Sequence, residues 1–340
     1  MNTTIGKIAK VEIKSLWNRF DLEWKLDPEV NILSGINGSG KSTILDCMAS
    51  LLMAGNLHYT LDSLVQSVKI TFENGRSISF DHFEETIKDL ELKAKKDDKF
   101  RSIISDIKEK EGANFKKIRS VSFGITSFDE LKVTLEELQQ LINIDVISTF
   151  DNAITEIGKR PDEQVYTELD RDIFKLQKKY MDYQLNIGKK AFEVVAKNGN
   201  SAGAEIMQIR KQQDRFLEII DELFKETDKR INRDKNEISF ICGKEELTAY
   251  QLSSGEKQML VILLTVLVQD NRPSIIFMDE PEISLHFDWQ KKLIQYIREL
   301  NPNAQIILAT HSPAVIMEGW RNKVQDVRDL IVLDKTKLKE

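Results

Sequence analysis

The stretch Gly35-Ile36-Asn37-Gly38-Ser39-Gly40-Lys41-Ser42-Thr43 decides the fold of this chain. It has the form G-x-x-x-x-G-K-[ST] and lies between an apolar strand at residues 30–33 and a helical run at 44–52. In this context the backbone N–H groups can curl around a phosphate, and the following helix adds the positive end of its dipole. Lys41 is expected to reach the β and γ phosphates, and Ser42 to offer its hydroxyl to Mg²⁺. The stretch therefore predicts a nucleoside triphosphate site, whose expected contacts are Gly35, Asn37, Gly38, Ser39, Gly40, Lys41, Ser42 and Thr43.

The composition indicates a soluble globular protein with one principal domain and a sizeable insertion. The chain has 340 residues, of which 41% are hydrophobic and 31% charged, with a formal net charge of −6. Any surface that binds nucleic acid must therefore be a local basic patch. Cys47 and Cys242 are the only cysteines, which favours a reducing compartment and argues against a disulfide framework or a zinc site. With no expected signal peptide or membrane-spanning run, we expect a cytoplasmic protein without a membrane partner.

Three segments follow from the hydrophobic pattern. Residues 1–80 read as an N-terminal lobe, with strands at Ser67–Phe72 and Ser77–Phe80 joined by a turn at Asn74-Gly75. Residues 81–236 read as a mainly helical insertion that offers a partner or sensor surface. Residues 237–340 alternate helix and strand, which is typical of a parallel sheet with crossover helices.

Charge is concentrated in the predicted insertion. The block Lys93–Lys99 is the densest run of charge, and a solvated helix face is favoured there over a binding patch. An acidic helix is expected at Phe128–Leu141. Two antiparallel helices are expected within Glu163–Lys235, joined near Lys197–Ser201.

An acidic pair ends the predicted strand at residues 275–278. The carboxyl ends of parallel strands face the ligand crevice, so Asp279 is placed to hold Mg²⁺ and Glu280 to accept a proton from an attacking water. A surface Asp-Glu turn is the alternative, and the P-loop upstream argues against it.

Two further segments complete the candidate site. Ser253-Ser254-Gly255-Glu256 opens a helix and can bind another anion through its backbone N–H groups. Because one P-loop already covers one nucleotide, we expect these four residues to contact the γ-phosphate held by a second copy of the chain. His311 ends the next strand and is expected to sense the γ-phosphate. For His286, function and surface packing are equally good interpretations.

Together these motifs resemble the head of the ABC-type ATPases, and more narrowly the SMC-like branch that includes double-strand-break-repair and OLD-type ATPases. The residues that carry the resemblance are Gly35–Thr43, Leu252–Gln258, Ile275–Glu280, Ser284–His286 and Thr310–Ser312. The resemblance implies an α/β P-loop NTPase of ABC-ATPase type, a mixed sheet with flanking helices plus a small antiparallel sheet and a helical insertion. It also implies a head-to-tail homodimer or higher oligomer around two ATP molecules, with Gln66 as the candidate glutamine that links Mg²⁺ to the insertion.

Departures from the better-known branches narrow this resemblance. The chain has neither the very long coiled coils of the chromosome-organising members nor a Cys-x-x-Cys hook, and the segment after residue 333 is short. Ser284-Leu285-His286 after Glu282 is similar to the compact ATPases of bacterial anti-phage systems of Septu, retron or PARIS type. We therefore expect an ATPase that controls a separate nuclease or toxin. A repair or recombination ATPase acting directly on DNA and an ATP-stabilised scaffold with little turnover are the alternatives, and a transporter ATPase is a more distant one.

Overall fold

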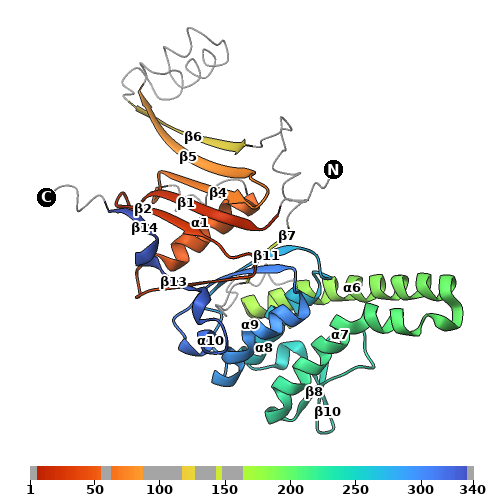
Figure 1. The fold of residues 1–340 in the computed structure, drawn as a ribbon. Coiled ribbons are helices and arrows are strands. Elements are labelled where there is room, and N and C mark those ends of the chain that lie inside the picture. The colour runs from red at the N-terminus through yellow and green to blue at the C-terminus, as the bar shows by residue number, and fades with distance from the viewer. Residues whose placement is uncertain (1–5, 55–62, 87–116, 127–142, 148–163, 335–340) are drawn as a thin grey trace, which may run out of the picture. The chain divides into compact units, whose positions relative to one another are not determined.

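The computed structural model describes residues 6–54, 63–86, 117–126, 143–147 and 164–334 (Figure 1). The chain forms two compact units. Unit 1 comprises residues 1–26, 46–141 and 328–340, and unit 2 comprises residues 27–45 and 142–327. Helix α1 (Lys41–Ala54) begins in unit 2 and ends in unit 1.

Unit 1 is built on an antiparallel sheet in the order β14-β2-β1-β4-β5-β6. Its strands are β1 (Ile8–Leu16), β2 (Phe20–Lys25), β4 (Ser67–Phe72), β5 (Ser77–Thr86), β6 (Lys117–Thr126) and β14 (Ile331–Asp334). The predicted hairpin at Asn74-Gly75 is confirmed, since Gly75 adopts a φ of 80° and β4 pairs with β5 on either side of it. Cys47 is buried in this unit, and burial, followed by the nearby Asp46 charge, raises the pKa of its thiol to about 12. The thiol is therefore a packing group.

Unit 2 contains a five-stranded sheet in the order β13-β3-β12-β11-β7, in which every pair is parallel. Its strands are β3 (Val30–Ser34), β7 (Asn143–Ile147), β11 (Ser274–Asp279), β12 (Ala304–Ala309) and β13 (Val324–Asp326). The three central strands β3, β12 and β11 are short, mostly apolar and almost wholly buried, as strands covered on both faces must be. Leu33, Ala309 and Asp279 stand side by side in the register, so β3, β12 and β11 end at one edge.

Helices and a smaller sheet complete unit 2. The helices are α6 (Glu168–Asn198), α7 (Gly203–Phe224), α8 (Ser254–Leu267), α9 (Phe287–Leu300) and α10 (Pro313–Met317). The smaller antiparallel sheet is β10-β9-β8, with bounds Glu245–Thr248, Ser239–Cys242 and Lys229–Ile231. Short 3₁₀ helices lie at Gly199–Ser201, Lys225–Thr227, Ala249–Gln251, Arg321–Lys323 and Val327–Leu330.

The two long helices α6 and α7 form the predicted helical pair, and α6 packs against both α7 and α8 (Figure 1). A capping box at Thr167 and Asp170 starts α6, and Gly199 with a φ of 50° ends it. Within the described residues, no helix is both long and apolar enough to cross a bilayer.

The α/β class predicted from the sequence is confirmed, and the boundaries of the three predicted segments stay predictions. Strand β5 continues to Thr86, beyond the expected lobe boundary at residue 80, and β7 lies inside the segment predicted to be a helical insertion. Its five residues pair with β11, about 130 residues further along the chain, and they overlap a strand that the residue pattern indicates at Val146–Thr149. The expected helix Phe128–Leu141 and the block Lys93–Lys99 lie outside the described residues.

Candidate nucleotide-binding site

Three loops meet at the carboxyl edge of the parallel sheet in unit 2. The loop after β3 carries the Gly35–Thr43 motif, the loop after β11 carries Glu280, and the loop after β12 carries His311. Backbone hydrogen bonds join them directly, because Glu280 N donates to Ala309 O at 2.8 Å and Thr310 N donates to Leu33 O at 3.1 Å. Ligands of open parallel sheets bind at this edge.

Lys41 is the centre of the site. It is only 5% exposed, and its ammonium group donates to Gly35 O at 3.3 Å and lies 2.5 Å from Nε2 of His311. Among the described residues, no carboxylate lies within ion-pair distance of it. A nearly buried ammonium without a counter-charge is costly, so the arrangement is that of an anion site. It lies at the first turn of α1, where backbone N–H groups also favour anions.

Glu280 and His311 complete a cluster with Lys41. Nε2 of His311, the atom that contacts Lys41, also lies 3.5 Å from Oε1 of Glu280. Since an ammonium group can only donate, Nε2 of His311 is the acceptor in its contact with Lys41. Glu280 also has a φ of 48°, an uncommon conformation for a residue with a side chain and one that often marks functional sites. The structure thus brings together both predicted catalytic residues and the lysine that is predicted to bind phosphate.

Glu282 and Gln290 hold the loop that carries His311, and the sequence analysis missed both roles. Oε1 of Glu282 accepts from Thr310 Oγ1 at 2.5 Å, His311 N at 3.0 Å and Ser312 N at 3.1 Å. Gln290 accepts from Ser312 Oγ at 2.6 Å and donates to Leu285 O at 2.9 Å. The loops after β11 and β12 therefore form one hydrogen-bonded unit around the imidazole.

The P-loop backbone leaves room for a ligand and little room for side chains. Gly35 has a φ of 150°, and a Cβ there would lie 2.7 Å from Ser39 Oγ. That Ser39 hydroxyl is buried and has no hydrogen-bond partner among the residues that the structure describes. A buried polar atom without a partner, beside Lys41, fits a loop shaped for a phosphate.

The predicted Mg²⁺ ligands are hard oxygen donors of the type that this cation prefers. The side chain of Ser42 is exposed at the start of α1, and Asp279 is half-buried at the end of β11. Both belong to unit 2, and their chemistry fits Mg²⁺. Gln66 belongs to unit 1, where Ser15 Oγ donates to its Oε1 at 3.0 Å, so its link to the metal stays a prediction.

The segment Ser253–Glu256, which is predicted to bind the partner's nucleotide, is at the start of α8, and some of its residues are exposed while Glu256 is buried. Ser253 is the N-cap, and both Ser253 and Ser254 are exposed. Glu256, by contrast, is 2% exposed and points inward, where it accepts from Lys229 Nζ at 2.9 Å, Thr227 Oγ1 at 2.8 Å and Ser253 N at 2.9 Å. Burial alone would raise the pKa of Glu256, but Lys229, then Ser253 and Thr227, hold it below the ordinary value. Of the four residues that are predicted to contact the partner's nucleotide, Glu256 is the one whose side chain is buried and bonded within the protein.

Gly255 is placed where only glycine fits. A Cβ at this position would lie 2.3 Å from the backbone oxygen of Ser284, which itself has a φ of 69°. The start of α8 therefore packs directly on the loop that follows the acidic pair. His286, left open by the sequence, has an exposed imidazole 4.0 Å from Asp288 and in edge contact with Trp289. Surface packing is the role that these contacts support.

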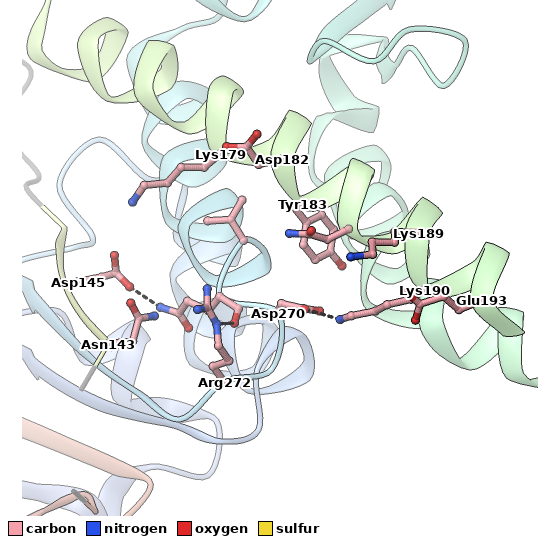
Figure 2. A pocket seen from close by; sticks show the side chains of 13 residues that line it. Asn143, Asp145, Lys179, Asp182, Tyr183, Lys189, Lys190, Glu193, Asp270 and Arg272 are labelled. Carbon is pink, nitrogen blue, oxygen red and sulfur yellow. Dashed lines mark hydrogen bonds and ion pairs between the residues drawn. The ribbon is translucent and has the colours of Figure 1, made fainter. Parts of the chain in front are cut away.

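The cavities of unit 2 include one beside the P-loop and one at the other edge of the parallel sheet. One, of about 640 Å³, flanks the P-loop and is lined by Ser34, Gly35, Ile36, Thr310, His311, Pro313, Ile316, Met317, Arg321, Val324 and Asp326. The other, of about 600 Å³, lies at the opposite edge of the parallel sheet, where β7 and β11 begin, and α6 forms one of its walls (Figure 2). It contains the Lys190–Asp270 ion pair at 2.5 Å and the bond from Gln269 to Asp145 at 2.7 Å. Only the first cavity adjoins the candidate site.

The geometry defines the class of protein as a P-loop ATPase, with the phosphate loop, acidic strand end and histidine on three adjacent parallel strands. The chain belongs to the family described as "AAA domain, putative AbiEii toxin, Type IV TA system", whose profile matches residues 30–318, more than half of the chain.

Curated relatives match shorter segments. The chain is 27% identical over 105 residues to "Retron Vc95 probable ATPase" of Vibrio cholerae, which is 28% of this chain and 20% of that protein. It is 30% identical over 108 residues to "Septu protein PtuA" of Bacillus thuringiensis, which is 28% of this chain and 27% of that protein. The chain thus matches about a quarter or less of the length of these relatives. These names agree with the predicted resemblance to ATPases of anti-phage systems.

Solved structures with a similar course of the chain include an Smc head bound to the C-terminal winged-helix domain of ScpA and the Smc head domain of Thermotoga maritima. Their TM-scores are 0.49 and 0.46, at 16% and 14% identity, and each alignment covers 92% of this chain and 91% or 92% of the other.

Proposed function

We propose that this protein hydrolyses ATP with Mg²⁺ at the carboxyl edge of its parallel sheet, and that the ATP-bound form dimerises head to tail and controls a separate effector, a nuclease or toxin. The observation that carries the first part is the nearly buried Lys41 ammonium, which has no carboxylate partner among the described residues and lies beside the unpartnered Ser39 hydroxyl. The triphosphate supplies the missing counter-charge.

Each residue of the cluster has a role in this proposal. Lys41 binds the β and γ phosphates and exchanges its contact with His311 for one with the nucleotide. Ser42 and Asp279 would hold Mg²⁺, which neutralises phosphate charge when it is bound. Glu280 accepts a proton from the attacking water, and His311, released from Lys41, contacts the γ-phosphate.

The exposed side chains around the site support the dimer. Ser253 and Ser254 at the start of α8 are exposed, and Ile36 in the P-loop is exposed as well. In a head-to-tail dimer, Ser253, Ser254 and the N–H group of Gly255 would contact the γ-phosphate held by the partner, while Glu256 holds the end of α8 in shape.

The effector rests on the relatives rather than on the site. Two curated relatives carry names from retron systems and one carries the name of a Septu protein. Those names motivate an effector-control role in anti-phage defence.

The variant Glu280→Gln tests the proposal. We expect kcat for ATP to fall by about 10²- to 10⁴-fold, because the general base is lost, while ATP binding is retained. The same variant with ATP should form a long-lived dimer in analytical ultracentrifugation and retain the effector in an affinity pull-down from native cells. Glu318→Gln, which changes an exposed carboxylate in the same unit, is the control and should leave kcat unchanged.

The outcomes separate the alternatives. Turnover that is unchanged in Glu280→Gln would remove Glu280 as the base. A wild-type protein that forms an ATP-dependent assembly with negligible turnover would support the scaffold. Abundant bound DNA without a stoichiometric protein partner would support the repair or recombination ATPase.

A further inference from the structure

Helix α6 carries two apolar stripes on different faces. The first stripe contains Ile173, Leu176, Tyr180, Tyr183 and Ile187 and is buried against the core of unit 2. The second stripe, here called the outer stripe, consists of Met181, Leu185, Gly188, Phe192 and Val195 and is exposed. At 100° per residue, the outer stripe is centred about 120° around the helix axis from the buried one.

The outer stripe has the spacing of a coiled-coil seam. Its members are separated by four, three, four and three residues, which is the alternation of a and d positions in a heptad. Leu185 is 72% exposed and Phe192 is 73% exposed. Single exposed apolar residues are ordinary on a protein surface, but a contiguous heptad seam about 21 Å long marks a contact surface.

The outer stripe is complementary to itself in size when two copies run antiparallel. In that orientation Leu185 of each chain faces the gap at Gly188 of the other, and Met181 faces Phe192. A parallel pair would instead place Gly188 on Gly188 and Phe192 on Phe192, which leaves a void beside an overpacked layer.

The flanking charges favour the same orientation. Asp182 and Lys189 occupy equivalent flanking positions one heptad apart, beside the outer stripe, and both residues are exposed. Both also line the cavity that α6 borders (Figure 2). Among the described residues neither takes part in an ion pair. Equivalent flanking positions face each other in an antiparallel pair, so Asp182 of one chain would meet Lys189 of the other, twice. In a parallel pair the same residues would face Gln177 and Gln184 and would find no counter-charge.

We propose that the outer stripe of α6 binds the outer stripe of a second copy of this chain, antiparallel and around a two-fold axis, without a requirement for ATP. Such a contact is isologous, so it closes as a dimer. Together with the ATP-dependent head-to-tail contact, it would link two such dimers into a larger assembly. This contact does not depend on the proposed ATPase function.

The first test measures the mass of the full-length protein without nucleotide, over about 1 to 100 µM, by sedimentation equilibrium. We expect a concentration-dependent dimer for the natural chain and a monomer for Leu185→Glu. Val332→Glu is the control, because it makes the same apolar-to-acidic change at a residue of β14 that is 69% exposed, and it should remain dimeric. A natural chain that is monomeric throughout this range would overturn the proposal.

A charge exchange tests the orientation with substitutions of exposed polar residues, which leave the core unchanged. Asp182→Lys should weaken the dimer at least about tenfold, or 1.4 kcal/mol, because it sets two lysines against each other at both ends. Adding Lys189→Asp should restore the dimer to within about twofold of the natural chain, since the pair re-forms with its signs reversed. Equal dimerisation of all three proteins, or no rescue in the double variant, would overturn the antiparallel contact. Because ATP is absent, these results stand apart from those with Glu280→Gln.

Discussion

The first turn of α1 and the first turn of α8 each contain a buried lysine, but only the lysine of α8 has a carboxylate partner among the described residues. Lys41 in α1 is 5% exposed and has only a carbonyl oxygen and an imidazole as partners among the described residues. Lys257 in α8 is 8% exposed and forms an ion pair with Asp170 of α6 at 2.8 Å. A buried charge that is paired within the protein has its desolvation cost offset by its partner, whereas one that is left unpaired is available to a ligand. The comparison distinguishes a binding lysine from a structural lysine.

The first turn of α8 also forms ion pairs and hydrogen bonds with the helical pair α6 and α7 and the residues that follow α7. Asp170 at the start of α6 holds Lys257, while Thr227 and Lys229, just after α7, hold Glu256. The start of α6 and the segment after α7 therefore contact two neighbouring residues, Lys257 and Glu256, in the first turn of α8. A movement of the pair would act first on the segment that is predicted to contact the nucleotide in the partner chain.

The largest effect is expected from Asp170→Asn, which turns Lys257 into a buried lysine without a counter-charge. Breaking one side of a buried ion pair should lower the free energy of unfolding by about 3–5 kcal/mol. Urea denaturation of the full chain measures this change. The control is Asp172→Asn on the same helix, because its ion pair with Lys175 is at the surface and should contribute less than about 1 kcal/mol. Equal losses in the two variants would contradict the structural role of Lys257.

A smaller effect is expected at Lys41, and only when ATP is present. Without nucleotide, Lys41→Met should change the free energy of unfolding by less than about 1 kcal/mol, because no ion pair is lost. ATP with Mg²⁺ at a hundred times its Kd should stabilise the natural protein by about 2.7 kcal/mol and Lys41→Met hardly at all. Thermal unfolding with and without ATP measures the difference. The control is Lys69→Met at an exposed position in β4, and equal stabilisation of Lys41→Met by ATP would refute the anion site.

The smallest effect is expected at Glu256 and depends on pH. The folded pKa lies below the ordinary value of 4.5, so the stabilising contribution is present above that value and is lost as the pH falls through the folded pKa. Glu256→Gln should cost about 1–2 kcal/mol at neutral pH and should flatten this acidic part of the stability curve. Unfolding in urea at a series of pH values measures both features.

Glu246 provides the matched control for that pH series. Lys235, then Ser239, lower the pKa of Glu246, but this carboxylate is exposed. Glu246→Gln should therefore alter the stability curve less than Glu256→Gln does. The reverse order would mean that the contacts at the start of α8 are not what stabilises this turn.

Much of the candidate site could be predicted because each motif carries its chemistry in neighbouring residues. A glycine-rich loop with Lys41, an acidic pair after a strand and a histidine after the next strand are each readable locally, and parallel strands bring their ends together. Glu282 and Gln290 were missed because their partners lie on a different strand loop, so no sequence spacing indicates them. Glu256 was predicted to contact the nucleotide because the pattern S-x-x-E occurs both in an anion-binding helix start and in a capping box. The sequence does not separate these two, whereas the burial of the side chain favours the capping box.

The sequence alone determined the α/β class, the nucleotide loop and its acidic and histidine partners, since these depend on residue type, local spacing and strand order. The tertiary structure decided which charges are satisfied. It paired Lys257 with Asp170 and Glu256 with Lys229, left Lys41 without a carboxylate among the described residues, and placed β7 beside β11. The physical reason is that the cost of a buried charge depends on its three-dimensional neighbours, and those neighbours come from distant parts of the chain.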